Sequence, residues 1–195
     1  MQNNITERII NKRFHDSSKT GLWEIPYTHS KQDWFGSLPY YFSSEVLNTI
    51  QQVYNKKNQY ICSATQTTEG IKAIIYVGTL LGIEKEMSYV PASTISAIVS
   101  QCSALVLWSV LRSQIDDPRA IYNRLVENEL VGFKKEQSVY RERVPLRTEI
   151  PVSIQIKRVV RANGNLVASE RISLGIYMYT EILGYAFLKG INSNT

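Results

Sequence analysis

Hydroxyl side chains are the chemically active groups in the most apolar part of this chain, residues 87–111. These twenty-five residues carry no formal charge. Serines recur there every three or four residues, a spacing that places them on one face of a helix: Ser93, Ser96, Ser100 and Ser103. Together with Tyr89, Thr94 and the free backbone N–H groups of a helix starting near Pro91, they could hold a carbonyl oxygen.

No acid–base residue accompanies these hydroxyl groups within the segment. Residues 87–111 contain no Asp, Glu or His, so the pairing of a histidine with an acid that a dehydratase needs is missing there. Glu84 and Glu86 precede the segment, where exposed turn carboxylates are the favoured interpretation. His15 and His29 could take part only if the N-terminal region folded over the site.

The cysteines favour a structural role. Cys62 and Cys102 show no CxxC spacing and no paired histidine, and an apolar setting disfavours the thiolate of Cys102. The N-terminus lacks the apolar segment of a signal peptide. These features indicate a reduced, cytoplasmic protein with no metal site and no cofactor of its own.

The elements that must position the hydroxyl groups begin with the uncharged segment itself. Its large residues recur with helical spacing: Ile95, Ile98, Val99, Cys102, Leu105, Val106, Trp108 and Leu111. A segment of this length could also span a bilayer. Its Ser, Thr and Gln content and the lack of a basic cluster at one end favour a helix buried in a protein core over a membrane span.

The rest of the chain indicates one α+β domain. Residues 1–42 predict a helix and an aromatic arm, and residues 43–195 the main domain. In the main domain the patterns predict helices over 43–55 and from Asp117, strands over 59–67 and 70–81, and a hairpin of 151–160 with 166–179 around an Asn-Gly turn. An antiparallel sheet wrapped around one long uncharged helix is the hot-dog fold, which we predict.

Basic residues concentrate in one segment. Residues 134–161 hold eight Lys or Arg and three Asp or Glu, a net charge of +5 that equals that of the whole chain. Such a segment could meet nucleic acid, an anionic membrane, an acidic carrier protein or phosphate groups, or could be a solvated strand face. No nucleic-acid-binding signature accompanies it, so we do not expect a nucleic-acid partner.

The chain resembles the FcoT-like thioesterases, hot-dog proteins that act on long-chain fatty acyl-CoA, with relatives that handle acyl chains on a carrier protein. The resemblance spans roughly residues 45–175 and lies in patterns rather than in one diagnostic motif. It rests on Tyr60-Ile61, Tyr76-Val77-Gly78, the turn over 86–90 with the helix behind it, the segment 140–146 and the strand 152–160.

Carried over position by position, the family's site is incomplete in this chain. Tyr54 and Tyr89 fall where the family has its tyrosines, and Ser96 falls at an asparagine position. The family's His and Glu positions correspond to Thr94 and to Val99 or Ile98, and its second asparagine to Leu105 or a neighbour. The resemblance therefore implies acyl binding with lost or altered chemistry.

What the resemblance implies is acyl-thioester hydrolysis in fatty-acid, lipid or polyketide-type metabolism. Tyr54, Tyr89, Thr94 and Ser96 would be the catalytic residues. The phosphates of CoA or of an acyl carrier protein would meet basic residues: Arg141, Arg143, Arg147, Lys157 and Arg158. Lyase, hydratase or acyl-transfer chemistry, or a non-catalytic acyl-binding or structural subunit, are the alternatives. Hot-dog domains pair their sheets edge to edge, so we expect a homodimer or a higher homo-oligomer.

Overall fold

A computed structural model describes residues 35–78, 88–162 and 165–188, without the side chains of 161 and 162. The elements in chain order are β1 (Tyr40–Tyr41), α2 (Ser44–Gln51), η2 (Lys56–Asn58), β2 (Ile61–Thr67), β3 (Gly70–Tyr76), α3 (Ala92–Gln114), α4 (Pro118–Glu127), β4 (Val131–Tyr140), β5 (Glu149–Ala162), β6 (Asn165–Leu174) and β7 (Met178–Ala186). The predicted helix and most of the arm within residues 1–42 lie outside the described residues.

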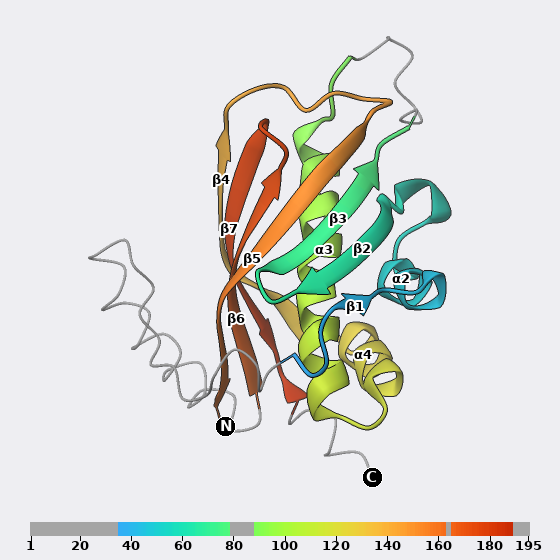
Figure 1. The fold of residues 1–195 in the computed structure, drawn as a ribbon, viewed down its shortest axis with the longest axis vertical. Coiled ribbons are helices and arrows are strands. Elements are labelled where there is room, and N and C mark those ends of the chain that lie inside the picture. Colours follow the sequence, from blue (N-terminus) through green and yellow to red (C-terminus); the bar gives the residue numbers. More distant parts are fainter. Residues whose placement is uncertain (1–34, 79–87, 163–164, 189–195) are drawn as a thin grey trace, which may run out of the picture.

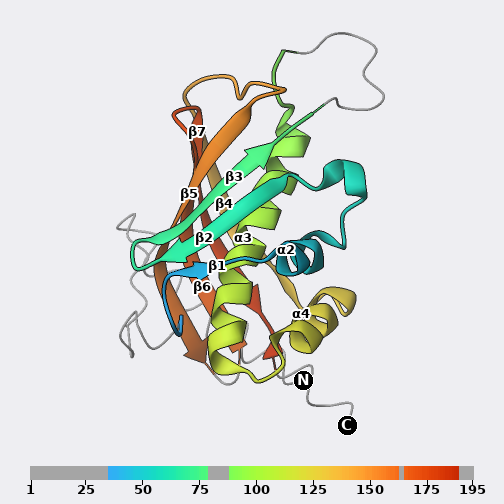
Figure 2. The same ribbon diagram turned by 45° about the vertical axis from the view of Figure 1, so that its right-hand side comes forward.

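The strands form one antiparallel sheet that curves around α3 (Figure 1). Its order is β1-β2-β3-β5-β6-β7-β4, so the described sheet ends in β1 on one side and in β4 on the other. Turning the molecule shows β2 and β3 crossing in front of α3, with α2 and α4 beside the helix (Figure 2). This is the hot-dog arrangement, and it confirms the fold predicted from the sequence.

Burial explains why α3 carries no charge before its last turn. Ile98, Val99, Cys102, Leu105 and Leu111 are 0% exposed, packed between the sheet and the shorter helices. A charged side chain at any of these positions would lose its hydration without gaining a partner. α3 is long and apolar enough to cross a membrane, but 61% of its most apolar window is buried inside the domain. Its hydropathy is that of a core helix.

Side-chain amides tie the start of β2 to the helices. Gln51 of α2 accepts a hydrogen bond from the Ile61 N–H at 2.9 Å and donates to the Ile61 carbonyl at 3.2 Å. Gln101 of α3 accepts from the Tyr60 N–H at 3.0 Å and donates to the Asn58 carbonyl at 2.6 Å. Both amides are buried, and they satisfy backbone groups that no neighbouring strand reaches.

Local sequence signals set the ends of the shorter helices. The Ser43 hydroxyl accepts from the Val46 N–H at the start of α2, and the Asp117 carboxylate accepts from the Ala120 N–H at the start of α4. Pro118 occupies the first turn of α4, where a missing N–H costs nothing. Both helices were predicted from these residues.

Two features of the C-terminal half differ from the sequence prediction. Residues 166–179 were expected to be one strand, but the chain turns at Gly175, whose φ is +51°, so that β6 ends at Leu174 and β7 begins at Met178. A glycine adopts this left-handed turn conformation without the steric cost of a side chain. The edge strand β4 was not predicted as an element, because its exposed central residues show no alternating pattern.

Candidate functional site

An apolar cavity of about 360 Å³ lies beside α3, and α4 and the strands β4 to β7 complete its wall. The residues that α3 contributes recur every three or four positions and therefore share one face of the helix. They are Ser100, Ser103, Ala104, Val106, Leu107 and Val110. The other walls are mainly aliphatic and aromatic, including Tyr54, Tyr122, Val126, Phe133, Leu166 and Tyr185.

A buried serine–carboxylate pair lies at the wall of this cavity. Ser103 lines the cavity, and its hydroxyl donates a hydrogen bond to Oε1 of Glu170 on β6. Glu170 is 1% exposed and stands on the face of β6 that meets α3. A Cβ built on Gly184 of β7, another residue of the cavity wall, would lie 3.6 Å from Ser103 Oγ and 4.0 Å from Glu170 Oε1. The carboxyl group is thus directly behind the wall.

The environment of Glu170 keeps a proton available near neutral pH. Burial raises the pKa of Glu170 to about 7, and the hydrogen bond from Ser103 offsets part of that rise. Its other oxygen, Oε2, is buried and has no hydrogen-bond partner among the described residues. Burial, and next the charge of Glu170, raise the pKa of the Cys102 thiol, so Cys102 is a neutral packing residue. A buried acid beside a cavity is a candidate for proton transfer.

Tyr54 brings a further hydroxyl group to the same cavity. It follows α2 and is half-buried in the cavity wall, where its side chain hydrogen-bonds to Ser100. Burial raises the pKa of Tyr54 more than this hydrogen bond lowers it. The phenol therefore keeps its proton and remains a hydrogen-bond donor. Tyr54, Ser100, Ser103 and Glu170 together form a polar cluster in this largely apolar site.

The other predicted catalytic residues lie elsewhere on α3 or before it. Tyr89 lines a separate hollow of about 320 Å³ at the start of the helix, together with Arg141 and Arg143. Thr94 hydrogen-bonds to the side chain of Tyr60, and burial is the main cause of the raised pKa of that tyrosine. Ser96 is exposed. Of the four predicted residues, Tyr54 is the one that lines the cavity beside Glu170.

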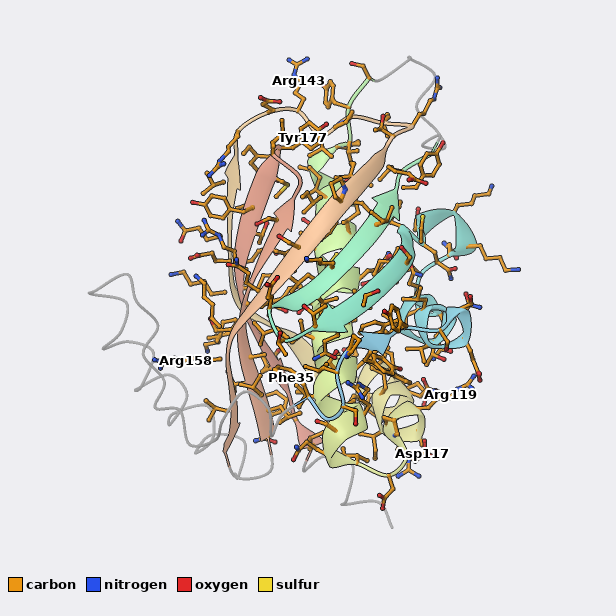
Figure 3. The ribbon with its side chains drawn as sticks, in the orientation of Figure 1. Phe35, Asp117, Arg119, Arg143, Arg158 and Tyr177 are labelled. Atoms are coloured by element: carbon orange, nitrogen blue, oxygen red, sulfur yellow. The ribbon has the colours of Figure 1, made fainter. Side chains whose placement is uncertain are left out.

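The basic residues are divided between two regions of the sheet. The Arg143 guanidinium carbon lies 4.9 Å from the centre of the Tyr89 ring, at the end of the sheet where α3 begins (Figure 3). Arg147, in the same connection between β4 and β5, has a φ of +56°, and its N–H donates to the Val77 carbonyl. Lys157 forms an ion pair with Glu181, and Arg158 lies far from Arg143 (Figure 3). The five basic residues do not form one cluster.

A third hollow, of about 220 Å³, brings two arginines to one tyrosine ring. The guanidinium carbons of Arg171 and Arg141 lie 3.9 and 5.6 Å from the centre of the Tyr179 ring. Arg171 was not among the residues singled out from the sequence. Its partner Glu181, 4.0 Å away, is also the partner of Lys157.

Several residues considered from the sequence are not placed. His15, His29, Glu84 and Glu86 lie outside the described residues. Within residues 35–78, 88–162 and 165–188, no group of three or more His, Cys, Asp or Glu side chains could hold a metal ion.

Glu170 is the functional candidate that sequence reasoning missed. The strand pattern contained the signal, because alternate residues of β6 face α3: Leu166, Ala168, Glu170, Ile172 and Leu174. A glutamate on the apolar face of a strand is expected to be buried, because that face packs against the core. The residues of the helix alone give no sign of this carboxyl group, because the sheet supplies it from 67 positions later in the chain.

The raised pKa of Glu170 predicts a pH-dependent stability. Because the folded state holds this proton up to about pH 7 and the unfolded chain releases it near 4.5, stability should fall as pH rises from about 4.5 to 7. The loss is at most about 3 kcal/mol. Glu170→Gln should flatten this dependence in urea unfolding at pH 5 and pH 8, whereas the exposed control Glu127→Gln should not. Equal slopes for the wild type and Glu170→Gln would contradict the assignment.

Comparison with known proteins finds similarity in structure alone. No family model and no curated protein sequence matches the chain. A mutant thioesterase from Pseudomonas aeruginosa is similar with a TM-score of 0.49 and 9% identity, over 79% of this chain and 98% of that one. Zebra fish thioesterase superfamily member 2 gives 0.47 and 7%, over 73% and 94%. A Thermus thermophilus thioesterase complexed with coenzyme A and Zn gives 0.36 and 12%, over 60% and 84%.

These solved structures are thioesterase-superfamily proteins, and the FcoT-like subfamily remains a prediction for this chain. At such identities and TM-scores the similarity says nothing about activity. The hot-dog fold itself stands on the strand order and on the helix enclosed by the sheet.

Proposed function

We propose that this protein binds an acyl chain, carried as a thioester on CoA or an acyl carrier protein, and hydrolyses the thioester. The observation that carries the proposal is the apolar cavity beside α3, with the hydroxyl groups of Tyr54, Ser100 and Ser103 in its wall and a buried carboxyl group behind Ser103. A cavity of this kind favours an alkyl chain, since each buried methylene contributes about 0.8 kcal/mol. Few polar groups are left to orient a polar ligand.

The hollow at the start of α3 supports a phosphate-bearing carrier. Arg141 and Arg143 line it together with Tyr89 and the first turn of the helix, where backbone N–H groups are free to meet an anion. Glu142 is the acidic residue among its lining side chains, so the balance of charge there is positive. We therefore assign Tyr89 and these two arginines to the phosphate end of the carrier, in place of direct contact with the thioester.

The row of serines on one face of α3 supports a path between the hollow at the helix start and the apolar cavity. Ser93 and Ser96 are exposed, and Ser100 and Ser103 line the cavity. Ile95, which lines the hollow at the helix start, is about 12 Å from Ser103 along the helix axis. Small side chains leave room for a thin, extended carrier arm to lie along this face. In this assignment Thr94 and Ser96 border the arm, and Tyr54 donates a hydrogen bond near the thioester.

Hydrolysis can be separated from the alternatives by its products. Incubation with a panel of acyl-CoA and acyl-carrier substrates should release free thiol and free acid. A changed acyl mass without thiol release would indicate lyase or hydratase chemistry. Specific acyl binding without any turnover would contradict the enzyme proposal.

Filling the cavity should block long acyl chains. Ala104→Phe places a ring in the wall of the cavity beside Leu107. We expect at least a tenfold loss of affinity for long-chain acyl-CoA and little loss for acetyl-CoA, because each methylene kept out costs about fourfold. Calorimetry with both ligands measures this. Ala120→Phe, on the exposed surface of α4, is the matched control, and an equal loss for both chain lengths would count against the assignment of the cavity.

Removing the charge of Arg143 should weaken only ligands that carry phosphates. Arg143→Gln is expected to cost about tenfold in affinity for acyl-CoA at low salt, and less at high salt. Acyl-N-acetylcysteamine lacks the phosphates and should bind both proteins equally. Arg124→Gln, on the exposed surface of α4, controls for the change in net charge. A similar loss with both ligands would show that Arg143 acts on the acyl end or on folding.

We also propose that two chains pair through β4. This strand ends the described sheet, so one side of its backbone has no neighbouring strand there. Pairing with the β4 of a second chain would extend the sheet across a two-fold axis. Light scattering should give a mass of at least twice the 22.3 kDa chain mass. A monomer at micromolar concentration would contradict this assembly.

A further inference from the structure

Ser103 is the described side chain that connects the cavity with a buried carboxyl group. Its hydroxyl lines the cavity and at the same time donates to Glu170 Oε1. Glu170 does not itself line the cavity and is 1% exposed. A ligand in the cavity would therefore meet Ser103 Oγ first, with the carboxyl group placed to accept its proton.

We propose that Ser103 is a nucleophile and that Glu170 is the proton acceptor behind it, so that the reaction passes through an acyl-serine. This inference rests on the proposed acyl-thioester function and specifies its chemistry. Ser103 would touch the reacting carbonyl. Glu170 lies behind Ser103 and holds the proton that Ser103 releases until the leaving group takes it.

Other serines of α3 are held differently. The Ser109 hydroxyl donates back to the Leu105 carbonyl at 2.8 Å, and that of Ser113 to the Val110 carbonyl at 2.9 Å, the ordinary way in which a helix satisfies a buried serine. Ser100 hydrogen-bonds to Tyr54. Ser103 instead points its proton at a carboxylate, which is the arrangement of an activated nucleophile and its base.

The surroundings of Ser103 supply space and donors. Gly184 faces the pair, and an added Cβ there would lie 3.6 Å from Ser103 Oγ, an ordinary van der Waals contact, so a carbon atom fits beside the hydroxyl group without a clash. Ser100 lies one turn before Ser103 on the same helix face, and Tyr54 is hydrogen-bonded to it. The Tyr54 hydroxyl group, held by Ser100, is an available donor for the oxygen that becomes negative during attack.

The proton and bond changes balance within the pair. As Ser103 Oγ bonds to the acyl carbon, its proton moves to the Glu170 carboxylate. The carbon–sulfur bond breaks, and the leaving thiolate takes that proton to become the free thiol. In the second half of the reaction, a water molecule gives a proton to Glu170 while the water oxygen bonds to the acyl carbon. The ester bond to Ser103 breaks, Oγ recovers the proton, and the carboxylic acid leaves.

A Ser103–Glu170 pair with only a structural role would stabilise the contact between β6 and α3 poorly, because of the free-energy cost of burying the carboxyl group. The carboxyl group is fully desolvated, its Oε2 is without a partner among the described residues, and Cys102 and Ser103 are the polar groups of α3 that interact with it. In the sheet, Glu170 of β6 is paired with Ile156 of β5 and with Ile182 of β7. Neither isoleucine can compensate the charge of a carboxylate. An apolar residue of the same volume would stabilise the fold more simply.

The test uses decanoyl-CoA as the substrate and its non-hydrolysable thioether analogue as the ligand, with the full chain. Wild-type protein, quenched in acid during turnover, should carry a decanoyl group on the peptide that contains Ser103. Ser103→Ala and Glu170→Gln should release thiol at least a hundredfold more slowly. Both should bind the thioether analogue within about threefold of wild type, which also shows that they are folded. Ser153→Ala, exposed on β5, should behave as wild type.

The pH profile separates a proton acceptor from a structural glutamate. Thiol release by the wild type should rise with pH and level off above about 7, as the Glu170 carboxyl group loses its proton. Glu170→Asp should restore part of the rate that Glu170→Gln loses. Near-wild-type turnover by Ser103→Ala, with no acyl-peptide in the wild type, would overturn the inference and leave the proposed function intact. If the wild type neither binds the analogue nor releases thiol, the proposed function fails and the inference fails with it.

Discussion

The enclosure of α3 by the sheet is the constraint on which the rest of the structure depends. A helix surrounded by β-strands on one side and by α2 and α4 on the other can carry no unpaired charge along the buried length. The first charged residue, Arg112, appears in its last turn, where the guanidinium donates to the carbonyls of Phe35 and Ser37. The helix is therefore a wall that offers hydroxyl groups and apolar surface. A carboxyl group at this wall must come from another element, and β6 of the sheet supplies Glu170.

Glu170 is a carboxyl group supplied by the sheet, but it is buried without a full set of hydrogen-bond partners. Most polar groups elsewhere in the core are better satisfied. Gln51 and Gln101 each satisfy two backbone groups at the start of β2, and Thr180 is paired with Ser138. Four buried side-chain atoms of the described residues lack a partner, and Glu170 Oε2 is one of them. Among these four residues, Glu170 is the one hydrogen-bonded to a side chain that lines the apolar cavity. A carboxyl group held there without full compensation is better explained by chemistry than by folding.

The sequence predicted the helices, most strands and the fold of the molecule better than the residues of its candidate site. The uncharged helix, the capped helices α2 and α4 and the β5–β6 hairpin each carry a local signal that the fold uses directly. β4 gave no such signal, because an exposed edge strand needs no apolar alternation. The site depends on which face of each strand meets the helix and on contacts between distant positions. Ser103 and Glu170 are sixty-seven residues apart, so no local spacing could join them. Tyr54 was identified through resemblance and lines the cavity, whereas Tyr89 lines a different hollow.

The most direct measurement is a crystal structure of the protein with the thioether analogue of decanoyl-CoA. We expect the alkyl chain to fill the cavity between α3, α4 and the strands β4 to β7. We also expect the atoms that replace the thioester to lie beside Ser103 Oγ and the phosphates to lie near Arg143 at the start of α3. An alkyl chain bound elsewhere, with an empty cavity and Ser103 remote from the ligand, would show that this cavity is not the acyl site.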